Sequence, residues 1–309
     1  MADRYERKLA ILHKIEAAYG TDIAPDTADA MIASNVTFSP MEGEDVQRDL
    51  ILPYLGSQGI ILAGTYARLE FDIEIAGAGA AGTVPRYGSL LRICGFSETV
   101  TVDTDVTYEI IEEGRESGSL YFVMDKVRHI LLGARGNVTE TFNAKGIPQF
   151  RFTVTGLLGT ISDQVSNPAV SSAGLITPLV VSKANTLLTL HGWTSIAESL
   201  SLDLGNTVTP SFLIGEEEIK ITNRQSTGTA VVKATALATV DWFAIANART
   251  RAALSMVHGT TAGNIVEVTA PKVEIGRPSQ GATNGIVNYS LPLMLCPDAG
   301  LDEKKIVVR

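Results

Sequence analysis

Cysteine and histidine are both scarce in this chain of 309 residues, which contains 2 cysteines and 4 histidines. Cys94 and Cys296 lie far apart and have neither metal-ligand nor redox spacing, which indicates reduced thiols in a cytosolic environment. No partner at metal-ligand spacing accompanies any of the histidines, His13, His129, His191 and His258. We therefore expect no metal and no cofactor.

Basic residues are also in short supply. The chain has 25 Lys and Arg against 34 Asp and Glu, which gives a formal net charge of −9 and a pI of about 5.0. This balance argues against tight wrapping of a nucleic-acid backbone, although it is compatible with a protein that lets DNA pass without gripping it. No apolar run is long enough to span a bilayer, and the charged start Asp3–Lys8 is unlike a signal peptide.

Catalytic signatures are missing as well. The sequence has no Gly-x-Ser-x-Gly elbow, no His-Glu-x-x-His and no phosphate-binding Gly-Lys-Ser/Thr. The segment Gly77–Gly82 spells a dinucleotide-binding fingerprint, but charges alternate in the strand before it and Pro85 delays the following helix. We interpret it as a flexible glycine loop. The carboxylates at 112–113 and 216–218 are typical of surface charge. The sequence predicts that the protein is not an enzyme.

Alternating strand patterns dominate what is present. In Tyr66–Ile75, the side chains of Arg68, Glu70, Asp72 and Glu74 fall on one face and apolar side chains on the other. Such a period predicts an antiparallel strand with one buried and one wet face. Further strands are predicted over 34–39, 101–111, 120–126, 150–157, 199–204, 230–240, 264–270 and 285–295. The fold class is therefore mainly β, with a β-sandwich or barrel and flanking α-helices.

Three helices are expected. The first covers Arg4–Tyr19 and ends at Gly20, and the second covers Pro85–Cys94 and ends at Gly95. The third covers Asp241–His258, with Asp241 as its cap and His258 near its negative C-terminal end.

The two halves of the chain show similar patterns. Each half has an opening strand (32–38 and 196–202), a loop arm, a second strand, a helix and a closing hairpin. We interpret this as an internal duplication. The predicted organisation is a first β domain at 1–160, a linker at 161–185 and a second β domain at 186–309.

The charged face of Tyr66–Ile75 has two interpretations. It could be the solvated outer face of a sandwich, or it could line a water-filled channel. In the second case, a negative lumen would repel phosphates, so that DNA would slide without binding.

Several motifs of the sequence, in their order and spacing, resemble those of the tail tube (major tail) proteins of long-tailed, siphovirus-type bacteriophages. The opening similarity comprises Tyr19-Gly20-Thr21, Pro25, Val36-Thr37-Phe38-Ser39-Pro40, Arg48 and Leu55-Gly56. The strand Leu69–Ile75 then leads into Gly77-Ala78-Gly79, Pro85, Leu90-Leu91 and Cys94-Gly95-Phe96. The resemblance covers about the first hundred residues by motif and the remainder by pattern.

This resemblance implies a tail-tube-type fold in which hairpins of neighbouring subunits join into one β-barrel ring around a lumen. Rings would stack through a loop arm, here Met41–Ser57, with Glu44, Asp45, Arg48 and Tyr54 as its contact residues. A duplicated chain would form a trimeric pseudo-hexamer, and a chain with a decoration domain would form a hexamer. The lumen-facing residues would be Arg68, Glu70, Asp72 and Glu74, with Lys233 and Thr235 of the second half aligned near Arg68 and Glu70.

The implied partners are further copies of the chain, with no membrane contact. Tape-measure protein and genomic DNA would occupy the lumen transiently, and tail terminator and tail-tip proteins would bind the ends. Assembly would take place in the bacterial host cytoplasm. Two alternatives stay open: a ring-forming tail-tip, baseplate or secretion-tube protein, and a ligand-binding enzyme that uses Trp193 and Trp242 for stacking.

Overall fold

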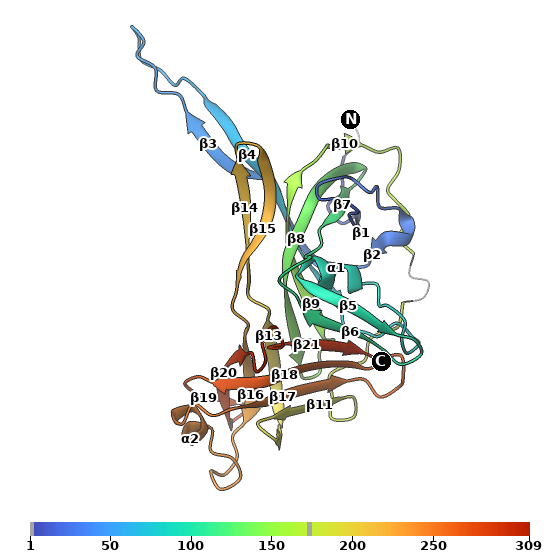
Figure 1. Cartoon of the computed structure of the whole chain (residues 1–309), viewed down its shortest axis with the longest axis vertical. Coiled ribbons are helices and arrows are strands. Elements are labelled where there is room, and N and C mark those ends of the chain that lie inside the picture. Colours follow the sequence, from blue (N-terminus) through green and yellow to red (C-terminus); the bar gives the residue numbers. More distant parts are fainter. Residues whose placement is uncertain (1–2, 172–174) are drawn as a thin grey trace.

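The computed structural model describes residues 3–171 and 175–309, and strands make up most of it (Figure 1). This confirms the mainly β fold class. A two-stranded arm extends away from the body at one end, and a short helix lies at the other (Figure 1).

A central sheet of eight antiparallel strands runs through both halves of the chain. Its pairing order is β3–β4–β9–β8–β13–β16–β20–β19. The bounds in that order are Ser34–Gln47, Ile60–Glu74, Gln149–Leu158, Val127–Asn143, Ala197–Asp203, Thr227–Lys233, Ile286–Cys296 and Ser279–Thr283. The predicted charged strand Tyr66–Ile75 matches the second part of β4 and extends one residue beyond its end, and the two predicted closing hairpins pair as expected.

Further strands branch from this sheet and cover its apolar side. From β8, the pairing continues through β7 to β1 and then β2, with bounds Gly118–Met124, Leu9–Ile15 and Ala30–Met31, and β8 also pairs with β10 (Ser162–Asp163). A second series runs β5–β6–β21–β18–β17–β11–β12, with bounds Phe96–Thr101, Asp105–Ile110, Lys305–Val308, Val266–Ile275, Arg251–His258, Thr186–Leu190 and Trp193–Thr194. One large apolar core joins residues of both halves.

The helices are short. The predicted helix after the glycine loop is confirmed as α1 (Gly88–Ile93), which buries Leu90, Leu91 and Ile93. The 3₁₀ turn η1 (Thr27–Asp29) has a capping box formed by Asp26 and Asp29.

The predicted N-terminal helix is wrong, because β1 occupies its centre. Strand β1 lies between β2 and β7, and its residues 10–13 are buried in succession. A strand covered on both faces gives a continuous apolar run, which periodicity alone does not distinguish from a helix.

The third predicted helix is correct only at its start. Asp241 accepts a hydrogen bond from the amide of Ala244 (2.9 Å) and caps α2, but α2 spans only Trp242–Asn247. Arg249 adopts a φ of 52°, and the chain then forms β17. His258 therefore ends a strand, where its ring contacts Thr186 Oγ1 at 2.8 Å. The predicted strand 230–240 likewise ends early, at Lys233.

The glycine loop is packed rather than flexible. The Gly77 amide donates to Asn264 Oδ1 (2.7 Å) and the Gly79 amide to the Gly263 carbonyl (2.9 Å). A Cβ at Gly77 would lie 2.1 Å from the Gly263 carbonyl oxygen. The glycines thus allow loops from the two halves to approach closely, and sequence reasoning missed this role.

The C-terminal segment fastens the halves together. Strand β21 pairs with β6 of the first half and β18 of the second. Just before it, the fully buried Lys304 ammonium forms an ion pair with the fully buried Glu140 of β8. Burial raises the pKa of Glu140, and the charge of Lys304 opposes that shift.

The predicted linker 161–185 contains β10 and otherwise lacks helices and strands where it is described; residues 172–174 lie outside the described residues. Its later part bonds to the first half, since the Val181 amide donates to the Gly146 carbonyl (2.9 Å). Within 3–171 and 175–309, no helix has the length and apolar character to cross a membrane.

Candidate functional site

One side of the central sheet is apolar and packs into the core, and the other is polar. Alternation along each strand decides which residues lie on the second side, because paired residues share a face. We name it the polar face, and its polar members are Arg68, Glu70, Asp72, Glu74, Arg135, Asn137, Thr139, Thr141, Asn143, Gln149, Arg151, Thr153, Thr155, Ser199, Ser201, Asp203, Thr227, Thr229, Lys233, Asn288 and Ser290. Most of these side chains are uncharged hydroxyls and amides. The apolar residues Val231, Pro292 and Met294 lie on the same side.

Two of the acids on β4, Glu70 and Asp72, pair with a residue that sequence analysis missed. Arg151 of β9 lies opposite Asp72 and donates to Asp72 Oδ1 (2.9 Å) and Glu70 Oε2 (2.7 Å). Arg68 pairs with Glu70 at 2.9 Å, and Asn35 donates to Asp72 Oδ2 (2.7 Å). The hydrogen bond to Glu70 is the main cause that raises the pKa of Arg151. The alternation of strand 150–157 could have placed Arg151 on this face.

Lys233 and Thr235, the expected counterparts of Arg68 and Glu70 in the second half, lie in another part of the structure. Strand β16 is separated from β4 by β9, β8 and β13, so the two groups are not in contact. Lys233 is the exposed last residue of β16, and Thr235 follows the strand with its buried Oγ1 lacking a hydrogen-bond partner.

Both ends of the central sheet are open edges. Among the described residues, β3 pairs only with β4, and β19 pairs only with β20. Every residue of β19 is exposed, and most of β3 is exposed as well. Unpaired backbone donors and acceptors on such strands are available to another chain.

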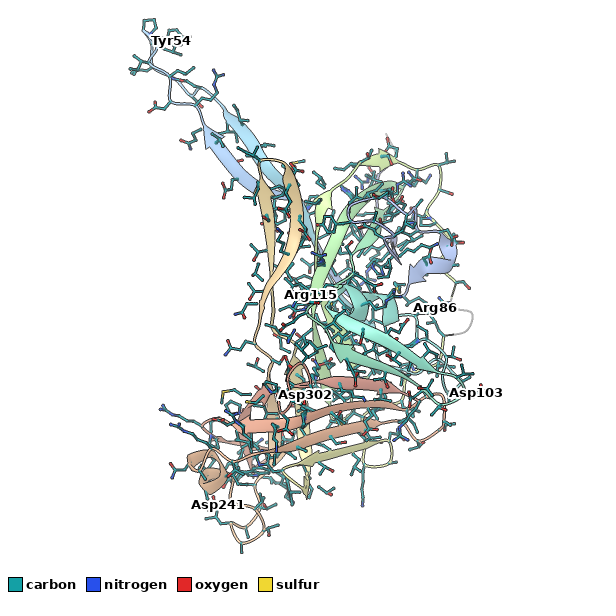
Figure 2. All side chains as sticks on the ribbon, viewed as in Figure 1. Tyr54, Arg86, Asp103, Arg115, Asp241 and Asp302 are labelled. Carbon is teal, nitrogen blue, oxygen red and sulfur yellow. The ribbon has the colours of Figure 1, made fainter. Side chains whose placement is uncertain are left out.

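The predicted arm Met41–Ser57 forms the end of β3 and the loop beyond it. Glu44 and Asp45 lie in β3, whereas Arg48 and Tyr54 lie in the loop, and Figure 2 shows Tyr54 at the far tip. Large apolar side chains are fully open to solvent there, since Ile51 and Leu55 each have 102% relative exposure. An apolar tip of this kind is typical of an interaction surface.

A second arm comes from the second half. The hairpin of β14 (Asn206–Leu213) and β15 (Glu216–Arg224) continues β13 and β16, just as the arm continues the β3–β4 pair. It lies against the first half, where Arg135 donates to Glu218 Oε1 (2.7 Å) and to the Ile219 carbonyl (2.8 Å). Near its tip, Phe212 stacks on Tyr66 with ring centroids 6.5 Å apart.

The residues that a ligand-binding enzyme would need are not arranged as a site in the described part of the chain. Trp242 is buried and meets Trp193 edge-to-face at 5.7 Å, so these rings form part of the core. Across the described ranges, no group of three His, Cys, Asp or Glu residues could hold a metal ion. Cys94 and Cys296 are both free thiols.

Comparison with known proteins agrees with the resemblance in the sequence. Residues 7–294, nearly the whole chain, match the family model described as phage tail tube protein. No curated protein matches the sequence. The chain therefore belongs to the phage tail tube protein family and is a structural component of the virion tail.

Proposed function

We propose that copies of this chain join edge to edge into closed rings, and that the rings stack into a tube through which the genome is ejected. The observation that carries the proposal is the central sheet, whose two end strands, β3 and β19, each have one edge with no partner strand among the described residues. Antiparallel pairing between copies would satisfy both edges, and closure into a barrel would leave none open.

The two halves act as two tube units within one chain, with the boundaries 1–160, 161–185 and 186–309. Two features support the duplication: the strand orders β3–β4–β9–β8 and β13–β16–β20–β19 run alike, and an arm extends the first pair in each. A ring then needs three chains to place six units. Three copies of the sheet, at about 4.8 Å per strand, give a backbone circumference of roughly 115 Å before strand tilt.

The polar face lines the lumen in this arrangement. Its acidic groups are partly balanced by ion pairs with Arg68 and Arg151, and Lys233 adds a further cation, so the lumen would be less negative than the acids of β4 alone suggest. A surface rich in Thr, Ser and Asn offers phosphates few fixed cations to bind. DNA and tape-measure protein would pass such a wall without being held.

The arm Met41–Ser57 makes the contact between rings. Its exposed Ile51 and Leu55 would be covered by an adjacent ring, which favours stacked rings over a single closed one. Tail terminator and tail-tip proteins would then cap the free ends of the tube, and assembly would occur in the host cytoplasm.

Negative-stain microscopy of concentrated protein tests the proposal. We expect rings and tubes, and a top view that counts three chains per ring. An Ala282→Glu variant should remain a folded monomer, because this exposed β19 residue would enter the junction between copies. Ala238→Glu, at an exposed loop position, is the matched control and should assemble normally. Wild-type protein that stays monomeric under all conditions would exclude the tube function.

A further inference from the structure

The chain already contains one junction between its two units. Strand β8 pairs with β13 in an antiparallel ladder from Ser199 opposite Asn143 to Asp203 opposite Thr139. The amide of Leu204 extends the ladder by donating to the Val138 carbonyl (3.0 Å). In the pairing order of the sheet, the end strand of the first unit, β8, is thus joined to the opening strand of the second unit, β13.

The free strand β19 corresponds to the paired end of β8. The two opening strands, 32–38 and 196–202, align Phe38 with Leu202, and these lie opposite Leu69 and Gly228. Phe71 and Ala230, two residues further on, are therefore equivalent, and so are the residues opposite them, Phe152 of β9 and Leu291 of β20. The residue before each of them faces the outermost strand of its unit. Arg151 lies opposite Thr139 in β8, and Ser290 lies opposite Ser279 in β19. Ser279 is therefore the counterpart of Thr139.

The free strand β3 corresponds to β13, because these two strands contain most of the aligned opening segments 32–38 and 196–202. Phe38 lies opposite Leu69, which is two residues before Phe71. Leu202 lies opposite Gly228, which is two residues before Ala230. Since the opening strands align Phe38 with Leu202, the next residues, Ser39 and Asp203, are counterparts as well.

We propose that β19 of one copy pairs with β3 of the next copy in the register of the β8–β13 junction, with Ser279 opposite Ser39 and Ala282 opposite Val36. This register rests on the proposed ring function and specifies its subunit contact. It places Ser279 and Ser39, which lie opposite the polar-face residues Ser290 and Arg68, on one side of the sheet. Ala282 and Val36 lie on the other side, where Val36 packs against the core. No side chain has to change face, as it would after a slip of one residue.

Two features make the contact head-to-tail and limit its length. Pairing β19 with β19, or β3 with β3, would give a two-fold dimer, whereas the β8–β13 junction joins unlike edges and so generates a ring. Pro40 follows Ser39 as Leu204 follows Asp203, so it occupies the position equivalent to Leu204. Leu204 donates its amide to the neighbouring strand, whereas proline has no N–H to donate. The ladder between copies therefore stops at Ser39, one hydrogen bond shorter than the junction within the chain.

Disulfide trapping tests the register. Ser39→Cys with Ser279→Cys is introduced into full-length protein that carries Cys296→Ser, and buried Cys94 is retained. Directly opposed antiparallel residues lie about 4.5–5.5 Å apart at Cα, within disulfide range. After mild oxidation of assembled protein, we expect most chains to run as covalent oligomers on a non-reducing gel, ending at the closed ring.

The controls come from the same sheet. Thr141→Cys with Ser201→Cys spans the β8–β13 junction and should give a cross-link within one chain. Ser39→Cys with Thr283→Cys shifts the register by four residues and should give several-fold less product. Rings with efficient cross-linking of the shifted pair, or of Ser279→Cys alone, would overturn the register but leave the tube function intact. Absence of rings in micrographs of the same samples would overturn both.

Discussion

His13 is held as a neutral side chain inside the first half. Its ring is buried, with Nδ1 3.0 Å from Ser89 Oγ and Nε2 lacking a partner. Burial, and to a lesser extent the charge of Arg92, lowers the pKa of His13 from 6.5 to about 3. In the unfolded chain the pKa of His13 returns to near its ordinary value. Unfolding therefore takes up a proton at any pH between the folded-state pKa and the unfolded-state pKa.

Acid should therefore destabilise the fold through His13. Between about pH 6.5 and 3 the unfolded state binds the extra proton, so the free energy of unfolding falls by up to about 1.4 kcal/mol per pH unit from this residue. Denaturant unfolding at several pH values should show a shallower fall for His13→Gln, which has no proton to take up. Parallel pH curves for the variant and the wild type would contradict the assignment.

The buried pair Lys304–Glu140 makes a second residue-scale prediction. Lys304→Met leaves the Glu140 carboxylate unpaired in the core and should cost about 3–5 kcal/mol in the free energy of unfolding. Lys305→Met is the matched control, because Lys305 pairs with exposed Glu109 at 3.0 Å and should change stability by less than about 1 kcal/mol. Adding Glu140→Leu to Lys304→Met should restore most of the loss. Equal effects of the two lysine variants would count against a buried charge at Glu140.

At the scale of elements, alternation predicted strands well and apolar runs predicted helices poorly. Strand β4 has one wet face, so its charges at every second residue identified it. Strand β1 is buried on both faces, and Arg251–His258 continues an apolar stretch that begins as a helix. In both places the surrounding strands, which one segment does not reveal, decide the conformation.

The arm offers a prediction about stacking. Ile51→Ser with Leu55→Ser removes the two most exposed apolar side chains of the tip and should leave the stability of the isolated subunit within about 0.5 kcal/mol. Microscopy should then show rings but few or short tubes. Val165→Ser, at a 98% exposed linker position, is the control and should form normal tubes. Normal tubes from the arm variant would show that the tip does not join rings.

At the scale of the whole molecule, the sequence predicted which residues share a face but not which strands are neighbours. The side chains Arg68, Glu70, Asp72 and Glu74 do share the polar face, as alternation required. The pairing of Glu70 and Asp72 with Arg151, and the three strands between β4 and β16, follow from long-range pairing that no local pattern contains. The arm was located correctly because it lies between two strands that pair with each other.

The covalent link between the two halves has a consequence for the accuracy of ring size. Because β8 and β13 are joined inside one polypeptide, the proposed ring can gain or lose units only in twos. A ring with five or seven units, the nearest miscount for an unfused subunit, is unattainable. The nearest incorrect rings would have four or eight units. Such rings would require a much larger change of curvature at every contact between neighbouring units. The fusion of two units in one chain would thus restrict the possible ring sizes and keep the diameter of the lumen constant.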